Sequence, residues 1–453
     1  MRLQLFAAML LCSAQCLAQK AASPDFESYI APYVTSNNFS GSVLIEKGGN
    51  IVFQRSYGFA DRESHVPNSS KTRFHVASVS MQFTAAAILR LIDQGSLKLD
   101  THVSEVVPRV SGGEKITIRD LLLQRSGLTD INGLPEYNEI LAHHQTPTTL
   151  VAKIKDKPLM FEPGSKYLHE EHSAYNLLAL ILENKTGLPF AAAMRELVFH
   201  PTGLSQAFID EDTISSAHDI ADGYQPKGVS ELEPAASIHW SAKAGNASAV
   251  ISAADSARLV RALFHSSFLK DPSRKAILET EPRVGYGWMR AQSDRFLQTT
   301  YYMNGRAPGF SSFVMYLPKD DLSVVVFSNI YSSATTTIGN DLAAISLGLP
   351  FTPFTHSGTV SADTIQHSAG TFHFGPDFYQ ANANVSLTND HRELFLRWPS
   401  GEQSPLIPTS PDQFIDRAYW EDVRIERDPA GTPSVLRYGR FQGRRIAAKD
   451  DSK

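Results

Sequence analysis

The stretch from Phe74 to Ile88 constrains the fold most, because a serine stands where an irregular segment turns into a strong helix. From Val79 to Gln94 the apolar residues recur at spacings of three and four, and Gly95 ends the pattern. A serine at a helix N-terminus lies among unpaired backbone N–H groups, at the positive end of the helix dipole. Ser78 therefore stands where a nucleophile that creates an oxyanion is favoured. An ordinary N-cap serine also suits this position.

The letters around Ser78, FHVASVSMQFTAAAILRLIDQGSLKLD, resemble the nucleophile segment of the serine beta-lactamase and penicillin-binding-protein-like family. The resemblance implies an S-x-x-K motif, in which a lysine one helical turn after the serine acts as base or proton relay. Here Met81 stands in the lysine position. A thioether cannot accept the serine proton or carry charge, and it fills apolar space. The nucleophile position is thus kept at Ser78, and the base is lost.

A second family motif, Tyr-x-Asn, is expected on the loop before the helix that begins near Ser173. Residues 161–167 resemble the family's F-x-P-G-x-x-F/W lead-in, and residues 174–178 resemble its exit. Between them no Tyr-x-Asn occurs, and the loop has one residue more than expected. Counting back from Tyr175 places Glu170 and His172 on the tyrosine and asparagine positions.

The same loop offers a replacement base. His172 or His169 could take the proton of Ser78, oriented by Glu170 or Glu171, in an arrangement like a catalytic triad. The alternative is that this polar run is only a solvated turn. A metal site is not expected, because the run matches neither H-E-x-x-H nor H-x-x-E-H.

The third family motif is Lys-Thr-Gly or His-x-Gly on the strand beside the cleft. Residues 301–312 resemble its surroundings, with a good match in Pro308-Gly-Phe-Ser-Ser. Met303 takes the histidine or lysine position, Asn304 follows, and only Gly305 of the triplet remains. The resemblance implies that these three positions bind substrate and that the backbone N–H groups of Ser78 and Arg306 form an oxyanion hole.

The sequence predicts an α/β fold with a small all-β domain after it. Strand-like runs near residues 41–59 and 285–327 enclose a mostly helical block, and short strand-like runs return after residue 370. This is the order of the β-lactamase/transpeptidase-like fold, an antiparallel sheet flanked by helices with an inserted helical block. We expect that domain over residues 19–349, a linker over 350–357, and a β-barrel or sandwich over 358–450.

The N-terminus predicts a secreted, periplasmic protein. Arg2, an apolar run and a small-residue site ending at Ala18 are typical of a signal peptide over residues 1–18. Both cysteines, Cys12 and Cys16, fall inside it, so the mature chain is expected to lack disulfides and a cysteine nucleophile. A net charge of −5 gives no reason to expect nucleic-acid binding, and no stable membrane anchor is predicted.

Two functions of different classes follow from these residues. One is a catalytically impaired or non-catalytic protein that binds a small-molecule, acyl or peptide/peptidoglycan-like ligand in the cleft around Ser78. The other is a working serine esterase, amidase or peptidase with a rebuilt base from the loop His169–His172. No cofactor is expected in either case.

Overall fold

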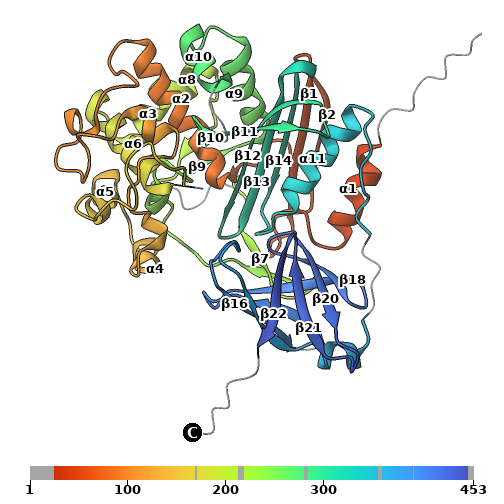
Figure 1. Ribbon diagram of the computed structural model, residues 1–453. Coiled ribbons are helices and arrows are strands. Elements are labelled where there is room, and N and C mark those ends of the chain that lie inside the picture. Colours follow the sequence, from red (N-terminus) through yellow and green to blue (C-terminus); the bar gives the residue numbers. More distant parts are fainter. Residues whose placement is uncertain are drawn as a thin grey trace, which may run out of the picture.

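A computed structural model describes residues 25–168, 171–212, 219–279, 284–355, 360–390 and 392–446. Within these residues the protein has a larger body, in which helices flank an antiparallel sheet, and a smaller barrel of strands beside it (Figure 1). The expected signal peptide, residues 1–18, lies outside the described residues, as do His169 and Glu170.

The sheet of the larger body joins the two ends of that body. It has seven strands in the order β10-β11-β12-β13-β14-β1-β2. Their bounds are β10 (Val284–Gly285), β11 (Trp288–Ser293), β12 (Gln298–Ala307), β13 (Phe310–Leu317), β14 (Leu322–Ser328), β1 (Gly41–Lys47) and β2 (Asn50–Tyr57). The N-terminal strand β1 pairs antiparallel with β14, from Gly41 opposite Ser328 to Lys47 opposite Leu322. The predicted strand–helix–strand order is therefore present.

Two hydrophobic cores lie on opposite faces of this sheet, because side chains alternate along each strand. Leu44 faces the core of the helical block, whereas Val43 and Ile45 face the core under α1 (Phe26–Thr35) and α11 (Ala334–Ser346). Both faces are thus covered, and every residue of β13 and β14 is buried. Figure 1 shows α1 and α11 on one side of the sheet and α2, α3 and α6 on the other.

The helical block holds the segments that surround Ser78. Its helices are α2 (Ser80–Asp93), α3 (Ile118–Leu122), α4 (Tyr137–Leu141), α5 (Pro147–Ile154), α6 (His172–Thr186), α7 (Phe190–Met194), α8 (His200–Thr202), α9 (Ala253–His265) and α10 (Asp271–Leu278), with the short helical turns η1 (Ala77–Val79), η2 (Val103–Glu105), η3 (Ile131–Gly133), η4 (Arg195–Phe199), η5 (Trp240–Lys243) and, between β13 and β14, η6 (Pro318–Asp320). Its short strands are β3 (Phe59–Asp61), β4 (Val66–Pro67), β5 (Phe74–His75), β6 (Phe208–Ile209), β7 (Tyr224–Pro226), β8 (Leu232–Pro234) and β9 (Ala249–Ile251).

The C-terminal part is a closed barrel, the first of the two architectures expected for it. Its strands are β15 (Gly370–Phe374), β16 (Asn384–Asp390), β17 (Glu393–Arg397), β18 (Gln403–Ser410), β19 (Gln413–Asp416), β20 (Asp422–Arg427), β21 (Pro433–Tyr438) and β22 (Phe441–Ile446), preceded by α12 (Ala362–Gln366). Closure leaves no open sheet edge, because β15 pairs with both β16 and β22.

A buried arginine of the barrel anchors it to the larger body. The Arg417 side chain is fully buried. Its guanidinium donates to Asn38 Oδ1 at 2.8 Å, to the Asn37 carbonyl at 2.7 Å, to the Glu231 carbonyl at 2.6 Å and to the Gly228 carbonyl. Burial lowers the pKa of Arg417 to about 10. These acceptors satisfy a charge that would otherwise be costly to bury.

Candidate functional site

Ser78 lies in η1, between the short strand β5 and helix α2. The preceding residue, Ala77, has a φ of +47°, a left-handed conformation that residues with a side chain rarely adopt. Such strain persists only where the surrounding structure holds it, and it clusters at functional sites. Ser78 is 5% exposed, and its Oγ has no hydrogen-bond partner among the residues that the structure describes. The turn fixes the place of the hydroxyl, and no described side chain accepts its proton.

Strand β12 lies directly against this turn at Gly305. A Cβ at Gly305 would come within 2.7 Å of the Ser78 backbone nitrogen and within 2.8 Å of the Val76 carbonyl oxygen. The neighbouring strand supports the same turn, because Ser312 Oγ donates to the Val76 carbonyl at 2.7 Å. Only glycine permits this approach, which explains why this position of the third motif is kept. The structure thus brings Ser78 and Gly305 together.

Met81 lies one helical turn after Ser78 and is completely buried. Its Sδ accepts a weak hydrogen bond from Gln124 Nε2 at 3.8 Å. Gln124 in turn accepts at Oε1 from the Glu171 backbone nitrogen at 3.1 Å. The lysine position is therefore filled by a thioether whose polar contact is a neutral amide.

Met303 is the second methionine in a motif position, and it is 3% exposed. It belongs to the same hydrophobic core as Met81. Along β12 the side chains alternate, so Met303 shares the face of Gly305, and Asn304 lies on the opposite face. Asn304 is half-buried there.

His172 begins helix α6 and faces the loop before η3. Its Nδ1 lies 3.3 Å from Asp130 Oδ1, and its Nε2 lies 3.3 Å from Asn132 Nδ2. A histidine beside an aspartate has the form of a base and its orienting group. The structure therefore supplies the pair, while no hydrogen bond joins it to Ser78 within the described chain. His169 and Glu170 fall outside the described residues, so their roles remain predictions.

Glu171, expected on a polar loop, is instead fully buried. It accepts from Ser126 Oγ at 2.6 Å and from the Ser126 backbone nitrogen at 3.2 Å. Burial raises the pKa of Glu171 to about 7, an effect that the hydrogen bonds of Ser126 partly oppose. This carboxyl therefore stabilises the loop after α3. It hydrogen-bonds Ser126, and it does not orient His172 as the sequence led us to expect.

Arg306 has two roles in the structure, one for its backbone and one for its side chain. Its backbone follows Gly305 along the strand that touches Ser78, where an oxyanion donor is predicted. Its guanidinium donates to the Ala418 carbonyl at 2.9 Å and lies 3.7 Å from the Tyr419 ring centroid and 4.4 Å from that of Tyr331. The barrel therefore holds the side chain of the residue that is expected to complete the oxyanion hole.

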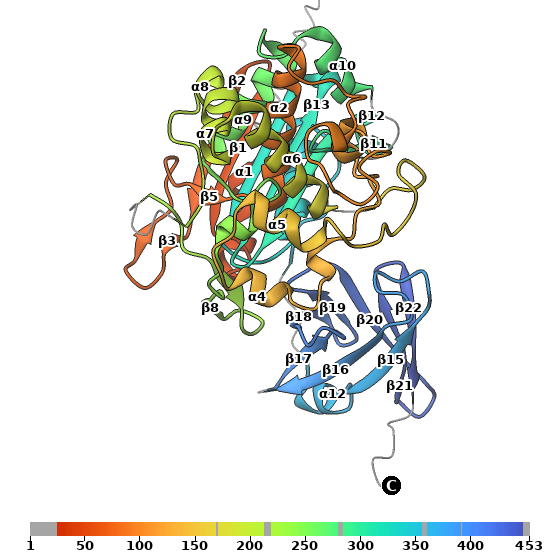
Figure 2. The same cartoon turned by 90° about the vertical axis from the view of Figure 1, so that its left-hand side faces the viewer.

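The structure pairs a buried lysine with a tyrosine that no sequence motif indicated. Lys243 is 8% exposed, donates from Nζ to Tyr137 Oη, and lies 4.9 Å from the Tyr137 ring centroid. Burial raises the pKa of Tyr137, and the charges of Asp130 and Tyr331 raise it further. Tyr137 lies on α4, at the edge of the body that faces the barrel (Figure 2).

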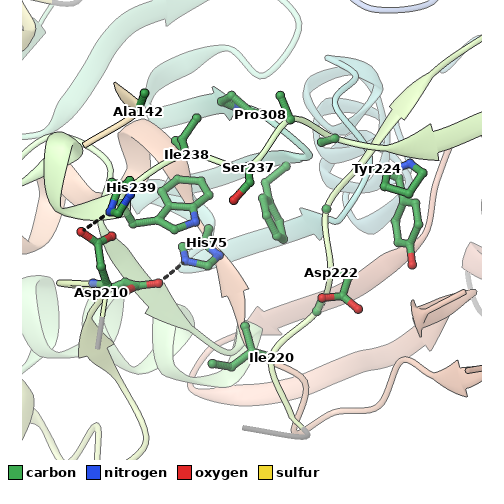
Figure 3. Close-up of a pocket in the computed structure, with 18 of the residues that line it drawn as sticks. His75, Ala142, Asp210, Ile220, Asp222, Tyr224, Ser237, Ile238, His239 and Pro308 are labelled. Atoms are coloured by element: carbon green, nitrogen blue, oxygen red, sulfur yellow. Dashed lines mark hydrogen bonds and ion pairs between the residues drawn. The ribbon is translucent and has the colours of Figure 1, made fainter. Parts of the chain in front are cut away.

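A cavity of about 870 Å³ opens beside the Ser78 turn, and we call it the acidic pocket. The described residues that line it include the carboxylates of Glu63, Asp210, Asp212 and Asp222, and no lysine or arginine. Figure 3 shows Asp210 in contact with His75, and Asp222 apart from them. His75 stands only three residues before Ser78, so the pocket shares a wall segment with the cleft.

No sequence pattern predicted these groupings. The His75–Asp210 contact joins residues 135 positions apart, and the Lys243–Tyr137 contact joins residues 106 positions apart. The one available signal was His75 itself, a titratable residue inside the segment that resembles the family's nucleophile motif.

Comparison with known proteins agrees with this geometry. The beta-lactamase family model matches residues 26–348. The protein PbpX of Bacillus subtilis (strain 168), which carries a penicillin-binding-protein name, is 28% identical over 312 residues, covering 68% of this chain and 75% of that one. Penicillin-binding protein 4* of the same organism is 23% identical over 425 residues, covering 89% of this chain and 93% of that one.

Solved structures extend the likeness to the barrel. The octameric penicillin-binding protein homologue from Pyrococcus abyssi superposes with a TM-score of 0.64 at 19% identity, covering 92% of this chain and 99% of that one. At that identity the likeness concerns the fold alone, and it confirms the predicted β-lactamase/transpeptidase-like fold. The Ser78 turn, the Gly305 strand beside it and the matched span of residues 26–348 place this chain in the beta-lactamase family of serine-hydrolase-related proteins.

Proposed function

We propose that this protein binds an acyl or peptide/peptidoglycan-like ligand in the cleft at Ser78 and hydrolyses it slowly or not at all. One observation carries the proposal: a methionine replaces the base lysine of the first motif, another replaces the histidine or lysine of the third, and Ser78 Oγ has no hydrogen-bond partner among the described residues. A serine needs a base to take its proton before it attacks.

The size of the expected deficit supports this choice. Removing the base of a serine hydrolase costs on the order of 10⁴- to 10⁶-fold in rate. An oxyanion hole and binding alone retain roughly 10³- to 10⁴-fold over water. We therefore expect Ser78 and the backbone donors of its turn and of Arg306 to bind an acyl ligand, and to hydrolyse that ligand only slowly.

The alternative function is a working serine esterase, amidase or peptidase with a rebuilt base. The contact of His172 with Asp130 favours it, since that pair could orient an imidazole toward a substrate. In the same structure Glu171, one of its expected orienting groups, is engaged with Ser126.

Intact-protein mass spectrometry separates the two functions. Wild type, Ser78→Ala and His172→Ala are incubated with a fluorophosphonate probe and with a penicillin, beside His367→Ala, an exposed histidine of the barrel domain, as the matched control. The proposal predicts that wild type forms adducts slowly or not at all. Rapid labelling that is lost in both Ser78→Ala and His172→Ala, and kept in His367→Ala, would establish the working hydrolase instead.

We also propose export, on the strength of the N-terminal sequence. Among the described residues no single helix is long and apolar enough to span a bilayer, although the segments His172–Thr186 and Phe190–Thr202 pass that test as a pair bent by 80°. N-terminal sequencing of the protein from a fractionated cell tests the expected cleavage after Ala18.

A further inference from the structure

The acidic pocket gathers four carboxylates, and no lysine or arginine is among the described residues that line it. The nearby groups that could carry positive charge are the partly exposed histidines His144 and His239, 2.9 and 3.1 Å from Asp212 Oδ2. Burial lowers the pKa of His75, which favours its neutral ring beside Asp210. Lining of this kind disfavours a carboxylate or phosphate ligand and favours a cation.

Asp222 is the carboxylate available to such a ligand. Glu63 is engaged by Tyr224 Oη at 2.5 Å, Asp210 lies 2.9 Å from His75 Nε2, and Asp212 lies 3.1 Å from His239 Nδ1. Asp222 has an exposed side chain, and its carboxylate has no hydrogen bond or ion pair within the described chain. Burial raises the pKa of Asp222, and the charges of Asp61 and Glu63 add to that effect. A ligand cation would relieve this repulsion.

One wall of the pocket is aromatic. The His75 ring stacks on Trp240, with centroids 3.8 Å apart and an interplanar angle of 12°, and Phe310 lies 5.8 Å from Trp240. Aromatic faces attract ammonium groups and pack against apolar bodies. The volume of about 870 Å³ lies within the range of pockets that hold small molecules.

His75 adds an unsatisfied group to that wall. Its side chain is 8% exposed, and Nδ1 is buried without a hydrogen-bond partner in the part of the chain described. The tautomer that donates from Nε2 to Asp210 leaves Nδ1 as an acceptor beneath the surface of the wall, so His75 presents its ring and not this nitrogen to a ligand. A bound metal ion is a poorer match, because no described group of three or more His, Cys, Asp or Glu side chains could hold one.

The pocket is held rigidly beside the cleft. A Cβ at Gly223 would come within 2.8 Å of Gly309 Cα, so two pocket walls meet backbone to backbone. Pro308 and Phe310 of one wall follow directly on the strand whose Gly305 touches Ser78. The pocket and the Ser78 turn therefore lie on adjoining segments of the chain, residues 75–78 and 305–310.

We infer that the acidic pocket binds the primary ammonium group of the cleft's ligand, with the ligand's apolar body against Trp240 and Phe310. This inference rests on the proposed function in one respect: the ligand bound at Ser78 and the ligand bound in the pocket are the same molecule. It identifies that ligand as an acyl or peptide compound with a free amine.

The test measures binding of phenethylammonium, and of the uncharged phenethyl alcohol, by isothermal titration calorimetry on the full protein. Ser78→Ala serves as the background, so the result does not depend on whether Ser78 reacts. Asp222→Asn removes the available charge, and Glu114→Gln removes an exposed charge outside the pocket as the matched control. Thermal unfolding of each variant confirms that it is folded.

Saturable binding of the amine is expected, with the alcohol about tenfold weaker or more, because a charge-assisted hydrogen bond to Asp222 is lost. Asp222→Asn should weaken amine binding about tenfold and leave the alcohol unchanged, while Glu114→Gln changes neither. Equal affinity for amine and alcohol, no saturable amine binding, or insensitivity to Asp222→Asn overturns the inference. Rapid adduct formation at Ser78 in the separate labelling experiment would overturn the proposed function and leave this result standing.

Discussion

The Ser78 turn and the acidic pocket share two chain segments, yet they differ in the groups that they present. The segment of Ser78 gives the pocket His75, and the segment of Gly305 gives it Pro308 and Phe310. At Ser78 the neighbours are backbone and a buried methionine, whereas the pocket keeps four carboxylates and an aromatic wall. In this scaffold the groups for chemistry and the groups for recognition can change independently.

The largest effect is expected from restoring the lysine of the first motif. Met81→Lys would place an amine where the side chain is completely buried, costing about 4 kcal/mol of unfolding free energy at pH 7. Burial lowers the pKa of the introduced lysine in the fold, so the loss should shrink as the pH rises toward about 10.4. Urea unfolding at pH 7 and pH 10, with Met81→Leu as control, measures it. Equal stability of the two variants at pH 7 would mean that the Ser78 turn is polar, and the contrast with the pocket would fail.

Glu171 provides the next largest effect, as a function of pH. Its pKa is about 7 in the fold against an ordinary 4.5, so the fold favours the protonated acid. The stabilisation is complete below pH 4.5 and is lost as the pH rises through 7. Between pH 5 and pH 8 wild type should therefore lose about 2.5 kcal/mol more than Glu171→Gln. The measurement is urea unfolding of both proteins across this pH range. If their unfolding free energies change with pH in parallel, the pKa of Glu171 is not raised in the fold.

Gly305 tests how closely the strand and the serine turn meet. Gly305→Ala places a Cβ within 2.7 Å of the Ser78 nitrogen and should destabilise the protein by about 2 kcal/mol. Gly133→Ala is the matched control, because nothing lies within 4 Å of its added Cβ. Chemical denaturation compares the two variants, and a Gly305→Ala protein as stable as the control would refute the contact.

The smallest effect concerns Arg306, which lies in the chain between Gly305 at the Ser78 turn and Pro308 of the acidic pocket. Tyr419→Leu removes a ring 3.7 Å from its guanidinium and should cost about 1 kcal/mol of stability. Because Pro308 follows closely, amine binding in the pocket should also weaken, by about twofold. Tyr419→Phe keeps the ring face and should behave nearly as wild type in the same titration. A phenylalanine variant as impaired as the leucine variant would assign the effect to the Tyr419 hydroxyl, which donates to Glu402 at 3.0 Å.

Much of the fold could be predicted from local signals. The serine before an amphipathic helix and the strand-like runs near residues 41–59 and 285–327 each depend on neighbours in sequence. These signals gave the order of elements, and the comparisons confirm the fold. The positions of Ser78 and Gly305 were predictable for the same reason, since each belongs to a short motif.

The contents of the site were less predictable, because they depend on distant residues. Burial turns Glu171 from a loop charge into a supporting acid, and nothing in the run around it distinguishes it from its neighbours. Asp210 directly follows β6 and Asp222 lies just before β7, and only tertiary packing brings these two ends to one pocket. Lys243 and Tyr137 meet only because η5 packs on α4.

The anchoring of Arg417 has a consequence for how the molecule folds. Its guanidinium fills four hydrogen-bonding positions on loops of the larger body, among them the carbonyls of Asn37 and Glu231. A chain that ends before the barrel would expose these acceptors to water and lose the contacts that hold the loops in place. We therefore expect the barrel and the body to unfold together, so that calorimetry of the whole chain registers a single melting transition.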